Sequence, residues 1–229
     1  MLAMILEGNL PRIYDLATSG RVLDVGGWWR PLNLATHVLD LRPYASRRQH
    51  DALDPQHGPR FSADTWVVWD ACCAPWPFPD KFFEFSFCSH LLEDVRDPLI
   101  VCAELIRVSK AGYIETPSRE REIFSKARFF SLRTALGRIP TVGFGHHRWF
   151  VELDGTHLRF TAKDLRLLAA RRNYITRRDL RRKMTAAESG IGLFWTGGFT
   201  FEECFLDGIP LDRFRDDALR RMKAALPPR

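Results

Sequence analysis

The chain lacks a long uninterrupted apolar segment. Nothing in its 229 residues approaches the roughly 20 consecutive apolar residues that a membrane-spanning helix requires. Residues 1–6 are apolar, but they lack the basic stretch and the cleavage site of a secretion signal. We therefore expect a protein without a transmembrane segment that is located in the cytoplasm.

Metal-binding cysteine motifs are missing as well. The cysteines number five, and the adjacent Cys72 and Cys73 cannot form the C-x-x-C clamp of a zinc site. No cysteine and histidine quartet with zinc-site spacing surrounds this pair. We expect reduced, half-buried thiols and no metal cofactor.

Internal repeats and low-complexity linkers are absent too. A chain of 229 residues, with 45% hydrophobic and 27% charged residues, is ordinary for a globular protein and long enough for one sizeable core. We expect a single domain over residues 1–229, in which residues 20–118 carry regular strand patterns and residues 119–190 form an irregular insertion or cap.

Charge is unevenly distributed along the chain. Residues 1–117 hold 11 Lys and Arg against 15 Asp and Glu, which gives −4, and residues 118–229 hold 23 against 13, which gives +10. An acidic first half suits a cationic or zwitterionic cofactor, and a basic second half suits an anionic substrate or surface. A solvated exterior would explain the basic half equally well.

Short apolar runs recur in the first half and end in an acid, a glycine or a proline. The run at residues 21–25 precedes Gly26 and Gly27, which indicates a buried strand that enters a tight turn. Similar runs predict strands at 37–41, 65–69, 82–88 and 111–116. Asp97 and Pro98 are typical of a helix start, and apolar residues follow at helical spacing. Strands with such connections predict a parallel sheet and the α/β class.

The second half predicts fewer elements. Residues 147–160 are typical of a hairpin with its turn at Asp154-Gly155. Residues 161–164 resemble a capping box that begins a helix at residue 165. The tail predicts a strand pair at 193–196 and 199–206, joined at Gly197-Gly198, and a short helix near 212–225.

Acids at the ends of three successive predicted strands indicate a ligand site. Asp24 precedes the glycine turn, Asp40 ends the second run, and Asp70 follows the third. In a doubly wound sheet, ligands bind outside the carboxyl ends of the strands, where the strand order reverses. Glycines there admit a ligand close to the backbone, and a carboxylate after the second strand can accept both ribose hydroxyls.

These residues resemble class I S-adenosylmethionine-dependent methyltransferases, in particular their ubiquinone-biosynthesis-like, methyltransferase type 11 branch. Val22-Leu-Asp-Val-Gly-Gly27 is similar to the first family motif and Val38-Leu-Asp40 to the second. Asp70 with Pro75-Trp-Pro-Phe-Pro-Asp80, and the stretch from Cys88 to Pro117, continue the pattern over residues 20–118. The resemblance implies a doubly wound, mostly parallel Rossmann-like sheet with helices on both faces and a substrate-side insertion.

The resemblance also implies a reaction and a set of site residues. The cofactor would be S-adenosylmethionine, the product S-adenosylhomocysteine, and the acceptor a small-molecule or glycan-like hydroxyl that is O-methylated. Gly26 and Gly27 would lie near the methionine moiety, Asp24 near its amino group and Asp40 at the ribose. The remaining residues expected to bind the cofactor are Leu41, Asp70, Ala71 and Ser89.

The chain departs from the family pattern after the first strand. The usual third glycine is absent, and Trp28 and Trp29 stand in its place. Only 16 positions separate Asp24 from Asp40, against roughly 20 in dinucleotide folds, which leaves little room for a helix. The cofactor's carboxylate would then lose a helix terminus as its support, and Arg30 could replace it. Asp94 stands where the family often has histidine.

His90, His147 and Arg148 are the candidates for substrate chemistry. Histidine can deprotonate a hydroxyl near neutral pH, and arginine can bind an anionic group with two parallel hydrogen bonds. Structural roles remain open for all three, because His90 can cap a strand, His147 can form a surface pair with His146, and Arg148 can brace a loop. Trp149, like the earlier tryptophans, can wall a pocket or belong to the core.

Two further interpretations come from other features. The truncated glycine turn suggests a non-catalytic methyltransferase-like binding protein, with Trp28 and Trp29 filling the pocket. Residues 171–183 carry seven basic residues and one acid, which suggests an RNA methyltransferase or an RNA-binding protein. No recognisable nucleic-acid module accompanies this run, and a solvated helix face also explains it, so nucleic acid is not the favoured partner.

Overall fold

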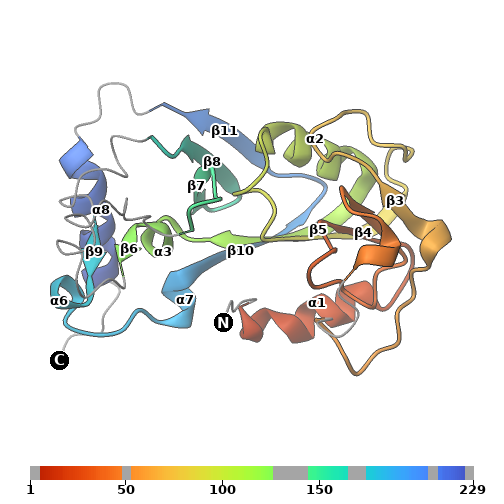
Figure 1. Cartoon of the computed structure of the whole chain (residues 1–229), viewed down its shortest axis with the longest axis horizontal. Coiled ribbons are helices and arrows are strands. Elements are labelled where there is room, and N and C mark those ends of the chain that lie inside the picture. Colours follow the sequence, from red (N-terminus) through yellow and green to blue (C-terminus); the bar gives the residue numbers. More distant parts are fainter. Residues whose placement is uncertain (1–5, 48–52, 126–143, 165–173, 206–210, 225–229) are drawn as a thin grey trace.

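The computed structural model describes residues 6–47, 53–125, 144–164, 174–205 and 211–224. Its central sheet is built from β1 (Val22–Val25), β2 (His37–Asp40), β3 (Trp66–Val68), β4 (Phe83–Ser89), β5 (Ser109–Pro117) and β10 (Gly190–Thr196). In the described part of the chain these six strands lie in the order β10-β5-β4-β1-β2-β3 (Figure 1). All neighbours are parallel except β10, which runs antiparallel to β5. The predicted α/β class with a mostly parallel sheet is confirmed.

Helices cover both faces of this sheet. Because side chains alternate along a strand, Leu23 and Val25 pack into one apolar cluster and Val22 packs into another. The first cluster includes the buried face of α2 (Pro98–Val108), and the second includes that of α1 (Leu10–Ala17). The two helices lie on opposite sides of the sheet in Figure 1. Helix α1 was not anticipated from the sequence.

The start of α2 forms as its sequence predicts. The Asp97 carboxylate accepts hydrogen bonds from the backbone N–H groups of Leu99 and Ile100, both at 3.1 Å. Pro98 occupies the first helical position, where no N–H is needed. A capped helix therefore connects the parallel neighbours β4 and β5.

A second sheet packs on the α2 side. It consists of β7 (Trp149–Asp154), β8 (His157–Ala162) and β11 (Thr200–Cys204), in the order β11-β8-β7. The predicted hairpin is confirmed, since β7 and β8 are antiparallel and Gly155 adopts φ +60° at the turn. Val151, Leu158 and Phe160 join the cluster that α2 forms with the central sheet, so the two sheets share one apolar core. Figure 1 shows the second sheet on the same side of the central sheet as α2.

The predicted strand pair in the tail is wrong in its partners. Strands form at both places, but β10 pairs with β5 and β11 pairs in parallel with β8. The turn at Gly197, with φ +78°, therefore carries the chain from one sheet to the other. Local turn chemistry indicates where a strand ends, whereas the unpaired edges of β5 and β8 decide where the next one pairs.

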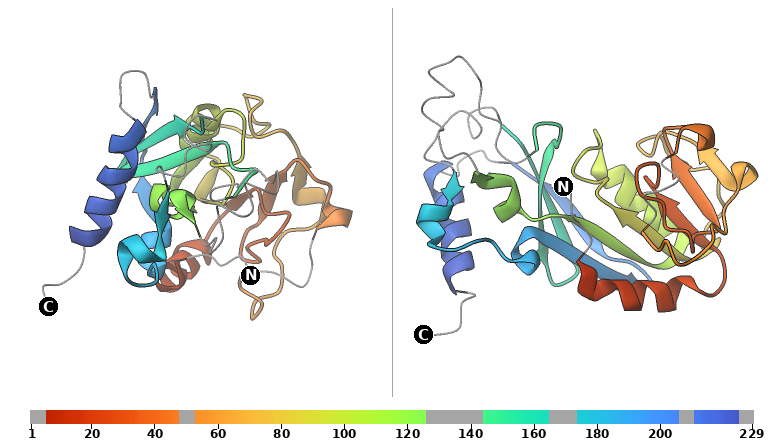
Figure 2. Two further views of the ribbon diagram at one scale, coloured as in Figure 1. Left: turned by 60° about the vertical axis from the view of Figure 1, so that its left-hand side comes forward. Right: turned by 60° about the horizontal axis from the view of Figure 1, so that its bottom comes forward.

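Short helices and a third cluster of buried apolar side chains complete the fold, at the opposite end from β3 (Figure 2). The elements there are α3 (Arg119–Ile123), β6 (Phe124–Ser125), β9 (Ile175–Thr176), α6 (Arg177–Leu180), α7 (Ala186–Ser189) and α8 (Leu211–Ala224). The 3-10 helices are η1 (Glu7–Asn9), η2 (Tyr44–Ser46) and η3 (Ala63–Thr65). Helix α8 confirms the predicted C-terminal helix.

Two further expectations can be compared with the structure. Thr161 belongs to β8, so the predicted capping box at residues 161–164 is wrong, because the hairpin continues through Ala162. The helix expected beyond it, from residue 165, lies outside the described residues. Among the residues that are described, no helix combines the length and apolar character needed to cross a bilayer.

Candidate functional site

The strand order reverses between β1 and β4. The chain adds β2 and β3 on one side of β1, then returns to place β4 and β5 on the other side. The loops that follow β1 and β4 consequently leave the same edge of the sheet. They also touch each other, since a Cβ at Gly26 would lie 3.1 Å from Cδ1 of Leu91. Ligands bind at such a reversal in open parallel sheets.

Asp24 is buried beneath the turn that follows β1. Its side chain is 1% exposed, and its Oδ2 accepts the backbone N–H of Leu32 at 2.9 Å. Burial, with Asp40 and Asp54 nearby, raises the pKa of this carboxyl to about 8. A Cβ at Gly27 would lie 2.4 Å from the same Oδ2, so the glycine is required by the chain's own carboxylate. Asp24 therefore shapes the loop around it.

Asp40 lies at the end of β2 and holds the same loop from the other side. Its Oδ2 accepts the backbone N–H of Trp28 at 3.0 Å, and its Oδ1 accepts that of Arg42 at 2.7 Å. Burial raises the pKa of this carboxyl, although the backbone hydrogen bonds oppose the rise. Each oxygen keeps a lone pair for a further donor. Leu41, the next residue, is 67% exposed and offers an apolar surface beside it.

The connection between β1 and β2 contains no helix anywhere in residues 26–36, all of which are described. The short spacing between the two acids predicted this. Trp28 is held by its indole N–H, which donates to the Ser46 carbonyl at 2.8 Å, and its ring lies 5.7 Å from that of Trp29. Arg30 is exposed.

Asp70 and Ala71 follow β3 in a turn. Asp70 forms an ion pair with Arg96, which lowers the pKa of the carboxyl, and it accepts the backbone N–H of Cys72 at 2.9 Å. Ala71 is buried, and its carbonyl accepts the indole N–H of Trp76 at 2.9 Å. An adenine amine at this turn would share Asp70 with the guanidinium of Arg96.

Ser89 ends β4, and His90 follows it in the left-handed conformation with φ +53°. The ring of His90 lies between two buried acids, with Nδ1 3.2 Å from Oε1 of Glu93 and Nε2 3.6 Å from Oε1 of Glu115. Burial lowers the pKa of the imidazole, but the two carboxylates outweigh it and raise the pKa to about 10. His90 is therefore a cation near neutral pH, which disfavours the base role expected of it.

His147 is buried in a separate polar cluster. Its Nδ1 is 2.7 Å from Oε1 of Glu122, and its Nε2 is 3.8 Å from Oδ1 of Asp94. Glu122 also forms an ion pair with Lys163, whose side chain is 3% exposed. Burial raises the pKa of Glu122, but the hydrogen bond with His147 and the charge of Lys163 outweigh this and lower it. His147 thus is part of a buried charge network and not half of a surface pair.

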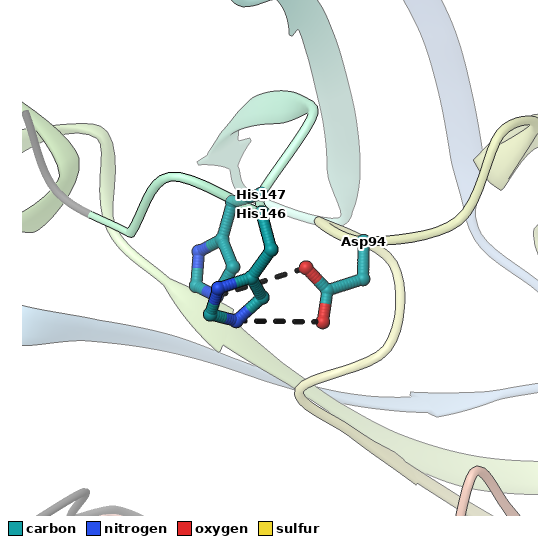
Figure 3. Close-up of side chains that lie close together, drawn as sticks. All are labelled: Asp94, His146 and His147. Carbon is teal, nitrogen blue, oxygen red and sulfur yellow. Dashed lines mark ion pairs between the residues drawn. The ribbon is translucent and has the colours of Figure 1, made fainter. Parts of the chain in front are cut away.

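His146 and Asp94 lie beside His147 at the surface (Figure 3). His146 is 65% exposed, and its Nε2 is 4.0 Å from Oδ2 of Asp94. Burial is the main cause of a raised pKa at Asp94, and the adjacent imidazoles oppose it. Arg148 is exposed, and its backbone N–H donates to the Glu93 carbonyl at 2.6 Å, which fixes this segment against the loop after β4.

A cavity of about 370 Å³ lies at the start of α2, between Trp149 and Glu203. Arg96, the ion-pair partner of Asp70, contributes to its wall. Trp149 lines this cavity, in agreement with the expectation that it could form the wall of a pocket. Asp24, Asp40 and the glycine turn do not line it.

The predicted residues fall into two groups along the edge of the sheet. Asp24, Gly26, Gly27 and Asp40 surround one loop, whereas Ser89, His90 and the segment at residues 146–148 belong to the other side. The sequence interpretation missed the acids Glu93, Glu115 and Glu122 and the cation Lys163. Glu115 carried a signal, because an acid inside an apolar strand is seldom buried without a partner. Glu122 and Lys163 carried none.

The residues along the basic run at 171–183 are only partly described. Arg182 forms an ion pair with Glu188 and also donates to the Met222 carbonyl at 3.1 Å. The guanidinium of Arg182 therefore connects α7 with α8, and its hydrogen bonds are made within the protein.

Comparison with known proteins adds no relative. No protein-family model matches the chain, and no curated protein sequence matches it. The carboxyl edge of the central sheet is therefore the basis for the function proposed below.

Proposed function

We propose that this protein is an S-adenosylmethionine-dependent methyltransferase that O-methylates a small-molecule or glycan-like hydroxyl. One observation carries the proposal. The glycine turn after β1 and the carboxylate of Asp40 after β2 meet beside the point where the strand order reverses, and Asp40 bonds to that turn. We interpret the central sheet accordingly as doubly wound and Rossmann-like.

The residues at this edge fit the polar groups of the cofactor. Asp40 has free lone pairs for the ribose hydroxyls, and exposed Leu41 would lie against the adenine ring. Asp70 would accept the adenine amine while it keeps Arg96. The sulfonium supplies the methyl group, and the protein's contribution is to align the acceptor oxygen with it.

The acceptor side requires a revised role for His90. Because Glu93 and Glu115 keep the ring charged, His90 would donate a hydrogen bond to the acceptor instead of removing its proton. His147 remains the candidate for accepting the hydroxyl proton, and Arg148 remains the candidate for binding an anionic group of the acceptor. Both lie on the opposite segment, which the Glu93 carbonyl holds to the loop after β4. A cytosolic location remains part of the proposal, since all five cysteines are free thiols.

Calorimetry with S-adenosylhomocysteine tests the proposal. We expect binding in the micromolar range, and a loss of about 100-fold in Asp40→Ala, because two charge-assisted hydrogen bonds to the ribose disappear. Asp54→Asn is the matched control: Asp54 is 0% exposed and also holds loop backbone, accepting the N–H of Asn33 at 2.6 Å, but it is not one of the expected site residues. Undetectable binding to the wild-type protein would reject the proposal.

A non-catalytic relative is the second candidate, favoured by the packing of Leu91 over Gly26. In that case the side chain of Leu91 would occupy the position of the methionine moiety, and S-adenosylhomocysteine would not raise the melting temperature of the protein. Leu91→Ala would then open the site and create binding that the wild-type protein lacks. An RNA-binding function predicts instead a steep fall of RNA affinity between low and moderate salt.

A further inference from the structure

Asp94, His146 and His147 bring three metal-ligating side chains together from two distant segments. Asp94 comes from the loop after β4, and the histidines come from the segment that enters β7 (Figure 3). One ligand atom from each residue lies within 4.8 Å of the others. The Nε2 atoms of His147 and His146 are 3.8 Å and 4.0 Å from the two oxygens of Asp94.

The orientation of His147 is set in advance. Its Nδ1 is bonded to Glu122 at 2.7 Å, so Nε2 is the atom that faces Asp94. A histidine that binds a metal through one nitrogen usually donates from the other to a carboxylate, which holds the ring in place. Lys163 and the Phe144 N–H, 3.4 Å away, hold Glu122 in turn.

Asp94 presents an unsatisfied oxygen to the same point. Its Oδ1 is buried, and no hydrogen-bond donor reaches it within the described parts of the chain. Buried carboxylate oxygens normally have a partner, because desolvation without one is costly. The nearest candidate, Nε2 of His147, lies beyond hydrogen-bonding distance at 3.8 Å.

We propose that Asp94, His146 and His147 bind one divalent transition-metal ion, with Zn²⁺ the best match to two imidazoles and a carboxylate. Bonds of about 2.0–2.2 Å place tetrahedral ligand atoms about 3.4 Å apart. One ligand atom from each residue lies within 4.8 Å of the others, so these separations would close by up to roughly 1.4 Å. His146 is exposed and can make this movement by rotating its side chain. Three protein ligands leave one position open for water or a ligand oxygen.

The proposed site differs from the expectation of no metal, which was based on the lack of cysteine and histidine motifs with zinc-site spacing. The metal site shares His147 with the acceptor side of the proposed function, but it does not depend on methyl transfer, because none of its three residues is among those expected to bind the cofactor. The alternative is an ion-pair cluster that uses the same three residues without a metal.

Titration of the untagged full-length protein with Co²⁺, followed by displacement with Zn²⁺, tests the site. We expect one equivalent of Co²⁺ to produce visible ligand-field bands without an intense near-ultraviolet thiolate band. Loss of an outer partner such as Glu122 typically lowers metal affinity by roughly 10–100-fold. Asp94→Asn and His146→Ala each remove a direct ligand, so each should lower the Co²⁺ affinity by more than this. Both variants change partly exposed side chains, and a thermal melt will show that they remain folded.

His157→Ala is the matched control. His157 also faces a carboxylate, that of Glu202 at 3.1 Å, but within the described residues the two have no third metal-ligating side chain beside them. This variant should leave the affinity unchanged. Absent binding, or binding that survives both site variants, would overturn the proposal. So would a thiolate band that Cys73→Ser removes. Co²⁺ binding without S-adenosylhomocysteine binding would reject the proposed function and leave this site intact.

Discussion

The buried acids on the two halves of the sheet's carboxyl edge have different main partners. Beside β1 and β2, Asp24 and Asp40 accept hydrogen bonds from the backbone of one loop. Beside β4, Glu93, Glu115 and Glu122 face the side chains of His90, His147 and Lys163, although Glu115 and Glu122 each also accept a backbone N–H. The first arrangement needs no cation, whereas the second collects several.

The difference determines on which side a carboxylate can exchange its partner without a movement of the backbone. A carboxylate that holds backbone N–H groups fixes a loop, because exchanging these partners would require the chain to move. A carboxylate that faces an imidazole or an ammonium can exchange its partner for a proton, a metal or a substrate while the backbone stays in place. We therefore expect a change of protonation on the β1–β2 side to act on the stability of the loop, and we expect exchange of a side-chain partner for a metal or a substrate on the β4 side.

The largest effect should come from Glu122→Gln. The substitution keeps the size of the side chain but leaves the Lys163 ammonium, 3% exposed, without its counter-charge. We expect a loss of about 3–5 kcal/mol in the free energy of unfolding, as is typical when a buried pair is broken. Urea denaturation at neutral pH measures it. A loss below about 1 kcal/mol would show that this network is solvated.

Asp24→Asn should have the next largest effect, visible as a change in pH dependence. The pKa of Asp24 is raised from 3.8 to about 8 in the folded protein, so its carboxyl favours folding while it is protonated. Its contribution is complete below about pH 4 and is lost as the pH rises to about 8. We expect the wild-type protein to lose about 2–4 kcal/mol across this window, less than the full pKa difference implies because the loop can admit water. The asparagine variant should be flatter, and equal slopes in denaturation series would contradict the prediction.

His90→Gln should remove a pH-dependent contribution to stability on the β4 side that changes at higher pH than that of Asp24. The pKa of His90 is raised from 6.5 to about 10, so its charged form stabilises the fold below about pH 6.5 and this contribution is lost by about pH 10. The ring is 36% exposed, and solvent screening limits the effect to about 1 kcal/mol. The variant should be less stable than wild type near pH 6 and equal to it near pH 10, by thermal or urea denaturation. A difference that persists unchanged at high pH would indicate lost packing instead.

The smallest effect is expected for Glu202→Gln in the second sheet. Glu202 is 50% exposed and pairs with His157 and Arg159 at the surface. Such exposed pairs contribute little to stability, so we expect almost no change in urea denaturation, and added salt should reduce even this difference. A larger loss would show that charge pairs in this protein do not depend on burial, and the contrast between the two sides of the edge would then fail.

Local patterns account for most of the first half of the fold. The apolar runs that end in an acid, a glycine or a proline predict β1 to β5, and Asp97-Pro98 predicts the start of α2. Each of these signals lies within a few residues of its consequence. The partners of β10 and β11 depend on sheet edges formed far away in the chain, so the glycines at 197 and 198 indicated a hairpin that does not form.

The candidate site divides in the same way. Asp24, Asp40 and the glycines could be located because a turn and a strand end mark them in the sequence. Glu115 and Glu122, which face His90 and His147, come from β5 and α3, and only the folded chain brings these pairs together. Asp94 was noticed only as a departure from the family pattern, and its role beside the histidines could not be inferred from that.

The antiparallel strand β10 has a consequence for folding during synthesis. β5 is almost entirely buried, and β10 covers one of its edges. The ribosome makes β10 only after it has added residues 118–189. Until then a nascent chain presents an apolar strand with unpaired backbone, the kind of edge that recruits other chains. Truncation before residue 190 should therefore yield an aggregating product, and chaperone demand should concentrate on this interval of translation.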